Sequence, residues 1–232
     1  MPSNIEMLQI VAVGLEDLKD DVVFVGGAVV ELYADNSAAS DIRPTADVDC
    51  VIDLGSRSSH AKLEEALRKK GFRNDTSKGA PICRYVFKGV KVDVMPSDFK
   101  LLGFSNKWYS DGIKNKIPKT LPNGTNIFIF SLEYYLAAKL EAYKDRGGND
   151  LRQSHDFEDI VYILDNYSEI FEIIKNSNKV VKEYLKKEFT ALLNNEYLIE
   201  GIECALPIGS DFSFDYTDMI SDLMKDIAEI DE

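Results

Sequence analysis

The sequence predicts an α+β fold, with a sheet in its first 130 residues and helices in the rest. Two observations predict it. Short β-branched runs broken by glycine and proline recur up to Phe130, a pattern typical of strands. After Phe130 the apolar residues follow helical spacing almost to the C-terminus. We therefore expect two domains, 1–130 and 131–232, the first built on a mixed, mostly antiparallel sheet flanked by helices.

Several runs in the first part are typical of β-strands. They are residues 21–25, 48–53, 82–87, 90–95 and 126–130. The third and fourth runs predict a hairpin, because Lys88-Gly89 is a turn-forming pair between two apolar stretches. Pro96 ends the second strand of that hairpin, since proline cannot donate a hydrogen bond to a sheet.

Helices are predicted on both sides of Phe130. Residues 28–34 are apolar and follow a strand, and residues 60–70 have inward-facing leucines at helical spacing before Gly71 stops them. Residues 131–146 form the first helix of the second part. From residue 154 onward nearly every segment reads as helical.

The composition indicates a water-soluble protein, with 45% hydrophobic and 29% charged residues. No apolar run is long enough to span a bilayer, and the N-terminus lacks the basic start and apolar core of a signal peptide. Cys50, Cys83 and Cys204 are odd in number and widely spaced, so we expect buried free thiols in a reducing compartment. These features predict a cytoplasmic protein with no membrane partner.

The net charge of −13 disfavours general nucleic-acid binding, because a polyanion repels another polyanion. The charge is nevertheless uneven: residues 57–91 carry a net +7, and residues 196–232 carry a net −10. The basic segment can hold a phosphate-bearing partner locally, or it can be ordinary solvated surface. The acidic segment, with Met219, Ile220 and Leu223 among its carboxylates, can dock a basic partner or pack on its own core.

Two aspartates interrupt an apolar strand one residue apart. Asp47 and Asp49 share one face, because side chains at i and i+2 of a strand point the same way. Adjacent carboxylates repel each other unless a cation lies between them, and hard oxygen ligands suit Mg²⁺ or Mn²⁺. Asp93 lies in the middle of the later strand, so all three acids converge if the hairpin pairs beside the first strand. Such a cluster can hold two metals for phosphoryl transfer.

Two further features suit a phosphate ligand. Gly26-Gly27 ends a strand, so backbone N–H groups can approach phosphate oxygens there; a purely structural turn is the alternative. Lys139 and Arg146 are two helical turns apart and can neutralise a triphosphate, or they can form a solvated helix face. Asp156 near the next helix start can be functional or can simply stabilise the helix dipole.

Aromatic side chains follow the third aspartate. Phe104, Trp108 and Tyr109 can stack on a base or an acceptor nucleotide. Packing of an irregular segment into the core is the alternative, and we favour it for Phe104 and Trp108.

Together these motifs resemble a known family. FVGG (24–27), TADVD (45–49) and KVDV (91–94) resemble the catalytic core of the DNA polymerase β-like nucleotidyltransferases. LAAKLEAYKDRGG (136–148) and SHDFEDIVYILD (154–165) resemble the branch of that superfamily containing AbiEii-type toxins. The resemblance covers residues 21–166 and implies a nucleotidyltransferase core followed by a helical C-terminal domain.

The resemblance also implies roles for individual residues. The catalytic, metal-binding acids are Asp47, Asp49 and Asp93, and the nucleotide-binding residues are Gly26, Gly27, Arg43, Thr45, Lys139, Arg146 and Asp156. Two departures concern nucleotide affinity. Gly27 stands where many relatives carry serine, and the gap between Gly27 and Asp47 is longer than in compact members, with Arg43 in the extra loop.

The implied activity is transfer of a nucleoside monophosphate from an NTP to an acceptor hydroxyl, with Mg²⁺ or Mn²⁺ and release of pyrophosphate. The implied acceptor is tRNA or another RNA, and a cognate antitoxin is an implied partner. A small molecule or a protein side chain is an alternative acceptor. The rival from another class is a nucleotide-binding or protein-interaction module on the same scaffold without turnover.

Overall fold

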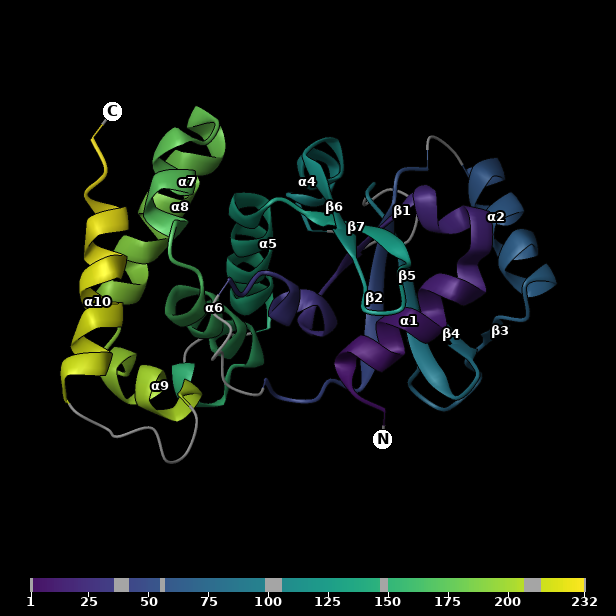
Figure 1. Ribbon diagram of the computed structural model, residues 1–232, viewed down its shortest axis with the longest axis horizontal. Helices are drawn as coiled ribbons and strands as arrows, with labels where there is room; N and C mark the ends of the chain where they lie inside the picture. The colour runs from purple at the N-terminus through teal and green to yellow at the C-terminus, as the bar shows by residue number, and fades with distance from the viewer. Residues whose placement is uncertain are drawn as a thin grey trace. The chain divides into compact units, whose positions relative to one another are not determined.

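The computed structural model describes residues 2–35, 42–54, 57–98, 106–146, 150–206 and 214–231 (Figure 1). The chain forms two compact units. The first comprises Met1–Val29 with Arg43–Ser131, and the second comprises Val30–Ile42 with Leu132–Glu232. The described part of Val30–Ile42 thus belongs with the C-terminal helices, whereas the sequence had placed it in the first domain.

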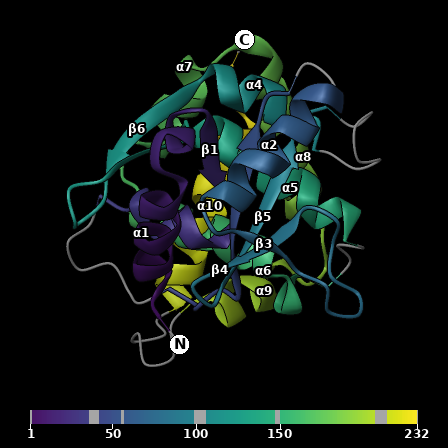
Figure 2. The ribbon, with the colours of Figure 1, turned by 90° about the vertical axis from the view of Figure 1, so that its right-hand side faces the viewer.

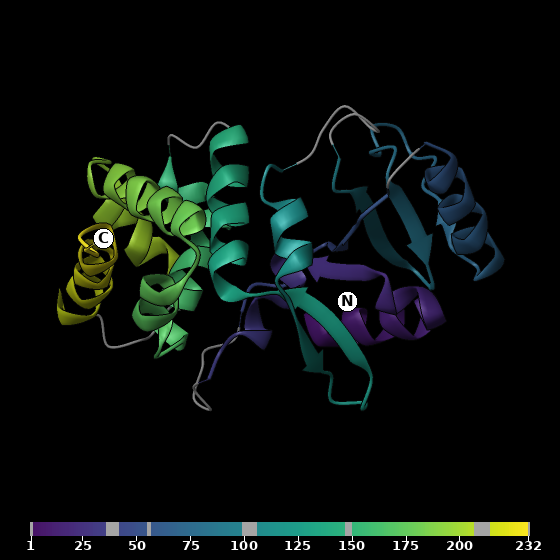
Figure 3. The ribbon, with the colours of Figure 1, turned by 90° about the horizontal axis from the view of Figure 1, so that it is seen from above.

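The first unit contains a seven-stranded sheet among its described residues, in the order β3-β4-β5-β2-β1-β7-β6. The strands are β1 (Val22–Val25), β2 (Asp47–Ile52), β3 (Arg73–Asn74), β4 (Arg84–Phe87), β5 (Val90–Pro96), β6 (Lys116–Thr120) and β7 (Asn126–Phe130). The pairs β1–β7 and β2–β5 are parallel, and the other four are antiparallel. The predicted mixed, mostly antiparallel sheet is therefore confirmed, and Figure 3 shows its β6–β7 hairpin in teal.

The predicted hairpin is the β4–β5 pair. Lys88 and Gly89 both have positive φ, 47° and 84°, as a two-residue hairpin turn requires. The turn pairs Phe87 with Val90 and therefore Arg84 with Asp93. The first strand begins two residues later than predicted, and Ile82 lies exposed before it.

Helices pack on both faces of the sheet. The helical segments of this unit are α1 (Asn4–Leu15), η1 (Glu16–Asp20), α2 (Arg57–Lys69) and α4 (Tyr109–Lys114). Phe87 stacks on Phe72 at 4.3 Å and lies directly against Gly14 of α1. Figure 1 shows α1 in front of β5, against which it packs, and Figure 2 shows α1 beside the strands and α2 nearer the viewer. Because side chains alternate along a strand, Arg84 and Asp93 project from the opposite face.

Residues 28–34, predicted as an apolar helix, form a tighter 3₁₀ helix, η2 (Gly27–Leu32), which joins the two units. Residues 60–70 do form a helix, α2, which begins earlier than predicted. Gly71 follows it with φ 91°, as expected of a helix stop.

The second unit is helical, as predicted. Its helices are α5 (Leu132–Asp145), η3 (Leu151–Gln153), α6 (His155–Asn166), α7 (Ile170–Asn176), α8 (Lys179–Leu193), α9 (Leu198–Ala205) and α10 (Phe214–Ala228). Ser154 caps α6, since its side-chain oxygen accepts a hydrogen bond from the Phe157 amide at 3.2 Å. Large buried side chains such as Tyr135, Phe157 and Phe189 form its core. In the part of the chain that the structure describes, no helix is both long and apolar enough to cross a membrane.

Candidate active site

Three aspartates occupy neighbouring positions on the face of the sheet opposite α1. Asp47 and Asp49 are two residues apart on β2, and the parallel pairing of β5 sets Asp93 directly beside Asp49. The Asp47 side chain is 27% exposed and that of Asp93 is 10% exposed. Neighbouring strands lie about 4.8 Å apart, so these carboxylates are close enough to share a cation. The strand pairing on which the predicted convergence depended is present.

Arg84 joins two of these aspartates. Its Nη2 donates to Asp47 Oδ2 at 2.6 Å and to Asp93 Oδ2 at 2.7 Å, while its Nε donates to Asp93 Oδ1 at 2.7 Å. The hydrogen bond with Asp93 raises the pKa of the Arg84 guanidinium above its usual value. Asp47 Oδ2 and Asp93 Oδ2 therefore lie close together, because both accept a hydrogen bond from the same nitrogen.

Sequence reasoning missed Arg84. A signal was available, because a two-residue turn at Lys88-Gly89 fixes which residues of the hairpin face each other. Counting outward from that turn sets Arg84 opposite Asp93, as the structure does.

Gly26 makes room for the second aspartate. Its φ is 74°, a conformation that favours glycine, and a Cβ built on it would overlap the Asp49 carboxylate. The pairing of β1 with β2 sets Val25 opposite Asp49, so the chain turns just beneath this carboxylate. Gly27 begins η2. Contact of either glycine with phosphate stays a prediction.

The backbone leading into β2 is held by α1. The buried Asn4 donates from Nδ2 to the Arg43 carbonyl at 3.1 Å and accepts from the Thr45 amide at 3.0 Å. The Thr45 hydroxyl donates to the Asp47 carbonyl at 2.9 Å. Thr45 therefore fixes the start of the strand that carries Asp47. Its predicted contact with a nucleotide, like that of Arg43, stays a prediction.

The remaining predicted residues, Lys139, Arg146 and Asp156, belong to the second unit. Lys139 Nζ lies 3.2 Å from Asp156 Oδ1 and 2.5 Å from Asp159 Oδ2, and Arg146 Nη1 lies 2.7 Å from Asp156 Oδ2. Lys139, Asp156 and Asp159 are 8%, 3% and 1% exposed.

These exposures decide between two of the alternatives. Lys139 is buried, so it does not belong to a solvated helix face. The Arg146 side chain, in contrast, is 72% exposed. Asp156 does more than stabilise a helix dipole, because it pairs with both cations. A contact of these residues with a triphosphate stays a prediction.

The aspartates of the first unit can be tested for their fit to a divalent cation. Within the described ranges, no three Asp, Glu, His or Cys side chains form a ready-made metal cage. Asp47 and Asp93 instead share the guanidinium of Arg84. Three carboxylates and one guanidinium carry a net charge of −2, and carboxylate oxygens are the ligands that Mg²⁺ and Mn²⁺ prefer. The donor set therefore fits a divalent cation, provided that Arg84 gives up some of its contacts.

Two cysteines near the aspartates are not nucleophiles. Burial raises the pKa of the Cys50 thiol well above its usual value, and the charges of Asp49 and Asp93 raise it further. Burial likewise raises the pKa of Cys83 to about 12. Because the thiolate is the reactive form, both thiols are inert at neutral pH. All three cysteines are free, and Cys204 is exposed, contrary to the expectation of three buried thiols.

The aromatic segment after β5 is partly structural. Trp108 is buried, which confirms packing as the better interpretation for that residue. Tyr109 packs near Phe130, and its hydroxyl lies 3.8 Å from the Met95 sulfur. The helix α4 thus covers the end of the aspartate-bearing face. Phe104 lies outside the described residues.

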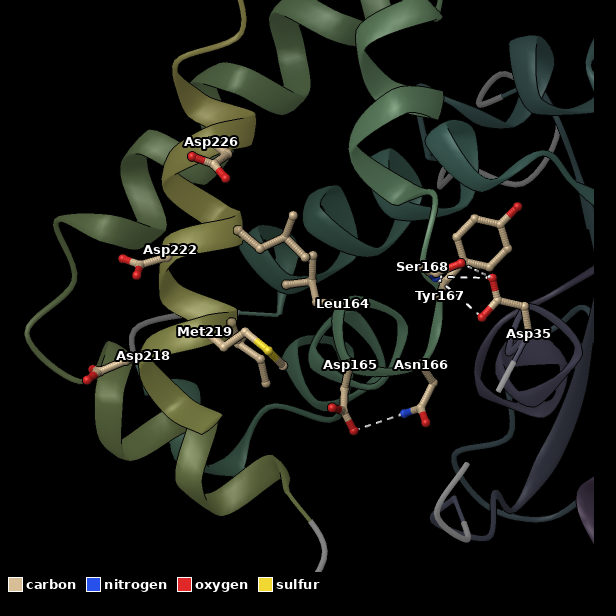
Figure 4. Close-up of a pocket in the computed structure, with 12 residues that line it drawn as sticks. Asp35, Leu164, Asp165, Asn166, Tyr167, Ser168, Asp218, Met219, Asp222 and Asp226 are labelled. Atoms are coloured by element: carbon tan, nitrogen blue, oxygen red, sulfur yellow. Dashed lines mark hydrogen bonds between the residues drawn. The ribbon is translucent and has the colours of Figure 1, made fainter. Parts of the chain in front are cut away.

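A hollow of about 780 Å³ in the second unit lies between the end of α6 and α10 (Figure 4). Its lining includes Asp35, Asp165, Asp218, Asp222 and Asp226. Burial raises the pKa of Asp165. This concentration of carboxylates repels a triphosphate, so the hollow is unsuited to an NTP.

The same hollow shows how α10 packs. In Figure 4, Met219 of α10 points toward Leu164 of α6, while the carboxylates of Asp218 and Asp222 point away from Leu164, at the edge of the hollow that they help to line. Ile220 is fully packed, whereas Met219 remains half exposed. Packing of the acidic C-terminal segment on its own core is therefore found at Ile220, whereas docking of a basic partner stays a prediction.

Comparison with known proteins adds little to this geometry. No family model and no curated protein matches the sequence. One similar solved structure is described as that of a "putative nucleotidyltransferase from H. pylori"; it has 13% identity and a TM-score of 0.44, over 97% of this chain and 94% of that one. A similarity of this extent does not establish a shared activity.

Proposed function

We propose that the protein is a metal-dependent nucleotidyltransferase, which moves a nucleoside monophosphate from an NTP to an acceptor hydroxyl and releases pyrophosphate. The observation that carries the proposal is the placement of Asp47, Asp49 and Asp93 side by side on one face of β2 and β5. Clustered carboxylates repel each other and are costly to keep together unless a cation shares them. Phosphoryl transfer uses such a cluster.

In this proposal Asp47, Asp49 and Asp93 hold Mg²⁺ or Mn²⁺. The bound cation supplies charge stabilisation at the phosphate and lowers the pKa of the attacking hydroxyl. Asp93 accepts the proton of the acceptor hydroxyl. The oxygen of that hydroxyl then bonds to the α-phosphorus, and the bond between the α-phosphorus and the pyrophosphate oxygen breaks. Gly26, which has no side chain, leaves room for the Asp49 carboxylate. Nucleotide contacts of Gly27, Arg43, Thr45, Lys139, Arg146 and Asp156 are carried over from the family resemblance.

We further propose an RNA acceptor, with tRNA as the first candidate. The net charge of +7 over residues 57–91 supports it, because a basic segment attracts a polyanion to an otherwise acidic chain. A small molecule or a protein side chain is the alternative acceptor. The toxin-like branch would add a cognate antitoxin as a partner. The free cysteines support a cytoplasmic location, where thiols stay reduced.

A second candidate function is nucleotide binding or partner docking without turnover. The pairing of Arg84 with both Asp47 and Asp93 favours it, because a guanidinium already neutralises two of the acids. Calorimetry with NTP and Mg²⁺, followed by a pyrophosphate-release assay, separates the two candidates. Heat of binding without pyrophosphate release would support the second.

The decisive experiment incubates the protein with each α-labelled NTP, Mg²⁺ and total cell extract. We expect one macromolecular or small-molecule species to retain label from one NTP. Asp49→Asn should abolish the labelling while leaving the fold intact, because it removes one carboxylate charge without changing the side-chain volume. Asp53→Asn is the matched control, since Asp53 is exposed at the end of β2 and accepts only from Ser97 Oγ among the hydrogen bonds described. Labelling that survives Asp49→Asn would refute the assignment.

A further inference from the structure

Arg84 is bound more tightly into the aspartate cluster than a surface cation would be. It lies on β4, which pairs with β5, so its side chain projects over the same face as Asp93. The guanidinium makes two parallel hydrogen bonds to Asp93 and a third to Asp47, and the side chain is 18% exposed. Bidentate pairing of this kind fixes both the guanidinium and the carboxylate.

Arginine has the chemistry of a permanent counter-ion. Its guanidinium stays protonated at any physiological pH, and its rigid fork matches a carboxylate. Carboxylates at neighbouring strand positions repel each other, and the repulsion is stronger where water is partly excluded. Arg84 therefore supplies the positive charge that holds Asp47 and Asp93 together without a metal.

We propose that Arg84 is the metal-free counter-ion of the aspartate cluster, and that a divalent cation binds by taking Asp47 and Asp93 oxygens away from it. Arg84 is thus a positioning residue that sets the affinity of the site for metal. The inference rests on the proposed function only for the claim that Asp47, Asp49 and Asp93 receive a divalent cation. What the inference adds is that the Arg84 guanidinium and the divalent cation compete for the same carboxylates.

The test is Mn²⁺ binding to the full chain, measured by calorimetry and by the EPR signal of free Mn²⁺. Arg84→Gln removes the competing charge, so its affinity for Mn²⁺ should rise by at least about tenfold. In EDTA the same variant should melt at a lower temperature than the wild type, and added Mn²⁺ should raise its melting temperature by more. Arg73→Gln on β3 is the matched control, because Arg73 is exposed and is paired in the sheet with Val86 rather than with an aspartate.

The outcomes separate this inference from the proposed function. If the wild type binds no Mn²⁺, the metal site fails and both are wrong. If the wild type binds Mn²⁺ and Arg84→Gln binds it no more tightly, the competition is overturned while the metal site stands.

A folding defect in the variant would also be informative. If Arg84→Gln folds only when Mn²⁺ is present, the proposal is supported. If it does not fold in either condition, Arg84→Lys decides. A lysine keeps one charge but cannot bridge Asp47 and make the bidentate pair with Asp93, so its Mn²⁺ affinity should exceed that of the wild type; an equal or lower affinity overturns the proposal.

Discussion

Replacing Gly26 with alanine should disturb the aspartate cluster as well as the backbone. Gly26 has φ 74°, and the added methyl group would overlap the Asp49 carboxylate. The neighbour is a charged group that lies against the turn between β1 and η2, so either the carboxylate or the turn must move. The variant therefore tests whether the glycine is present to make room for Asp49.

The two effects of the substitution have separate magnitudes. An alanine in the left-handed region costs about 1–2 kcal/mol. Forcing a methyl group into an occupied space costs about 1–3 kcal/mol more, because neighbouring groups must shift. We expect a total loss of about 3 kcal/mol in the free energy of unfolding. If the carboxylate moves by about 1 Å, label transfer should fall by about a hundredfold.

Gly124→Ala provides the matched control. Gly124 has φ 82°, close to that of Gly26, but nothing lies within 4 Å of where its Cβ would be. This variant should therefore lose only the backbone contribution, about 1–2 kcal/mol. Urea unfolding of both variants in EDTA, with the NTP-labelling assay alongside, measures stability and site geometry separately.

A double-mutant cycle with Asp49→Ala identifies the neighbour that is displaced. In the Asp49→Ala background, Gly26→Ala should cost less than in the wild type, because the carboxylate is gone and only the Cβ of residue 49, 3.0 Å from the added methyl group, remains close. An equal cost of Gly26→Ala in both backgrounds would show that the Asp49 carboxylate does not occupy the space next to Gly26. The geometry assigned to this side of the cluster would then be wrong.

Two further predictions concern buried groups. Lys139→Met should destabilise the second unit by about 3 kcal/mol in urea unfolding, because it leaves Asp156 and Asp159 buried without their shared ammonium. The control is Lys225→Met, which breaks the exposed pair with Asp222 and should cost below about 1 kcal/mol. Equal losses in the two variants would contradict the reasoning. In native protein at pH 8, alkylation mapped by mass spectrometry should modify the exposed Cys204 first, whereas Cys83, with its pKa of about 12, should react only slowly. Raising the pH to 10 should speed the Cys83 reaction by about a hundredfold, and equal rates at pH 8 would refute its burial.

Local signals explain what the sequence predicted correctly. The pair Lys88-Gly89 specifies a two-residue turn, and the alternation of Asp47 and Asp49 specifies a shared face whatever the rest of the sheet does. Both features depend on residues close together in the chain. The edge strand β6 was not predicted, because Pro118 in its middle argues against a strand. An edge position tolerates a proline, since the missing N–H can face outward.

Long-range contacts explain what was missed. The spacing of Lys139 and Arg146 on α5 indicates only that they share a side of the helix. It cannot show that α6 brings Asp156 and Asp159 against Lys139 and buries all three. The 3₁₀ form of η2 was likewise missed, because a mostly apolar run as short as residues 28–34 fits either kind of helix.

The aspartate cluster is more easily explained by chemistry than by stability. Replacing a buried ion pair with apolar residues of similar size is often neutral or stabilising, so a fold gains little by keeping one. Here the chain keeps three acids on two adjacent strands, an arginine paired with two of them, and a glycine with positive φ next to the third. Apolar side chains at these positions would continue the strands without the repulsion and without the need for Gly26. The arrangement makes sense if the acids must stay ionised, close together and ready to exchange one cation for another.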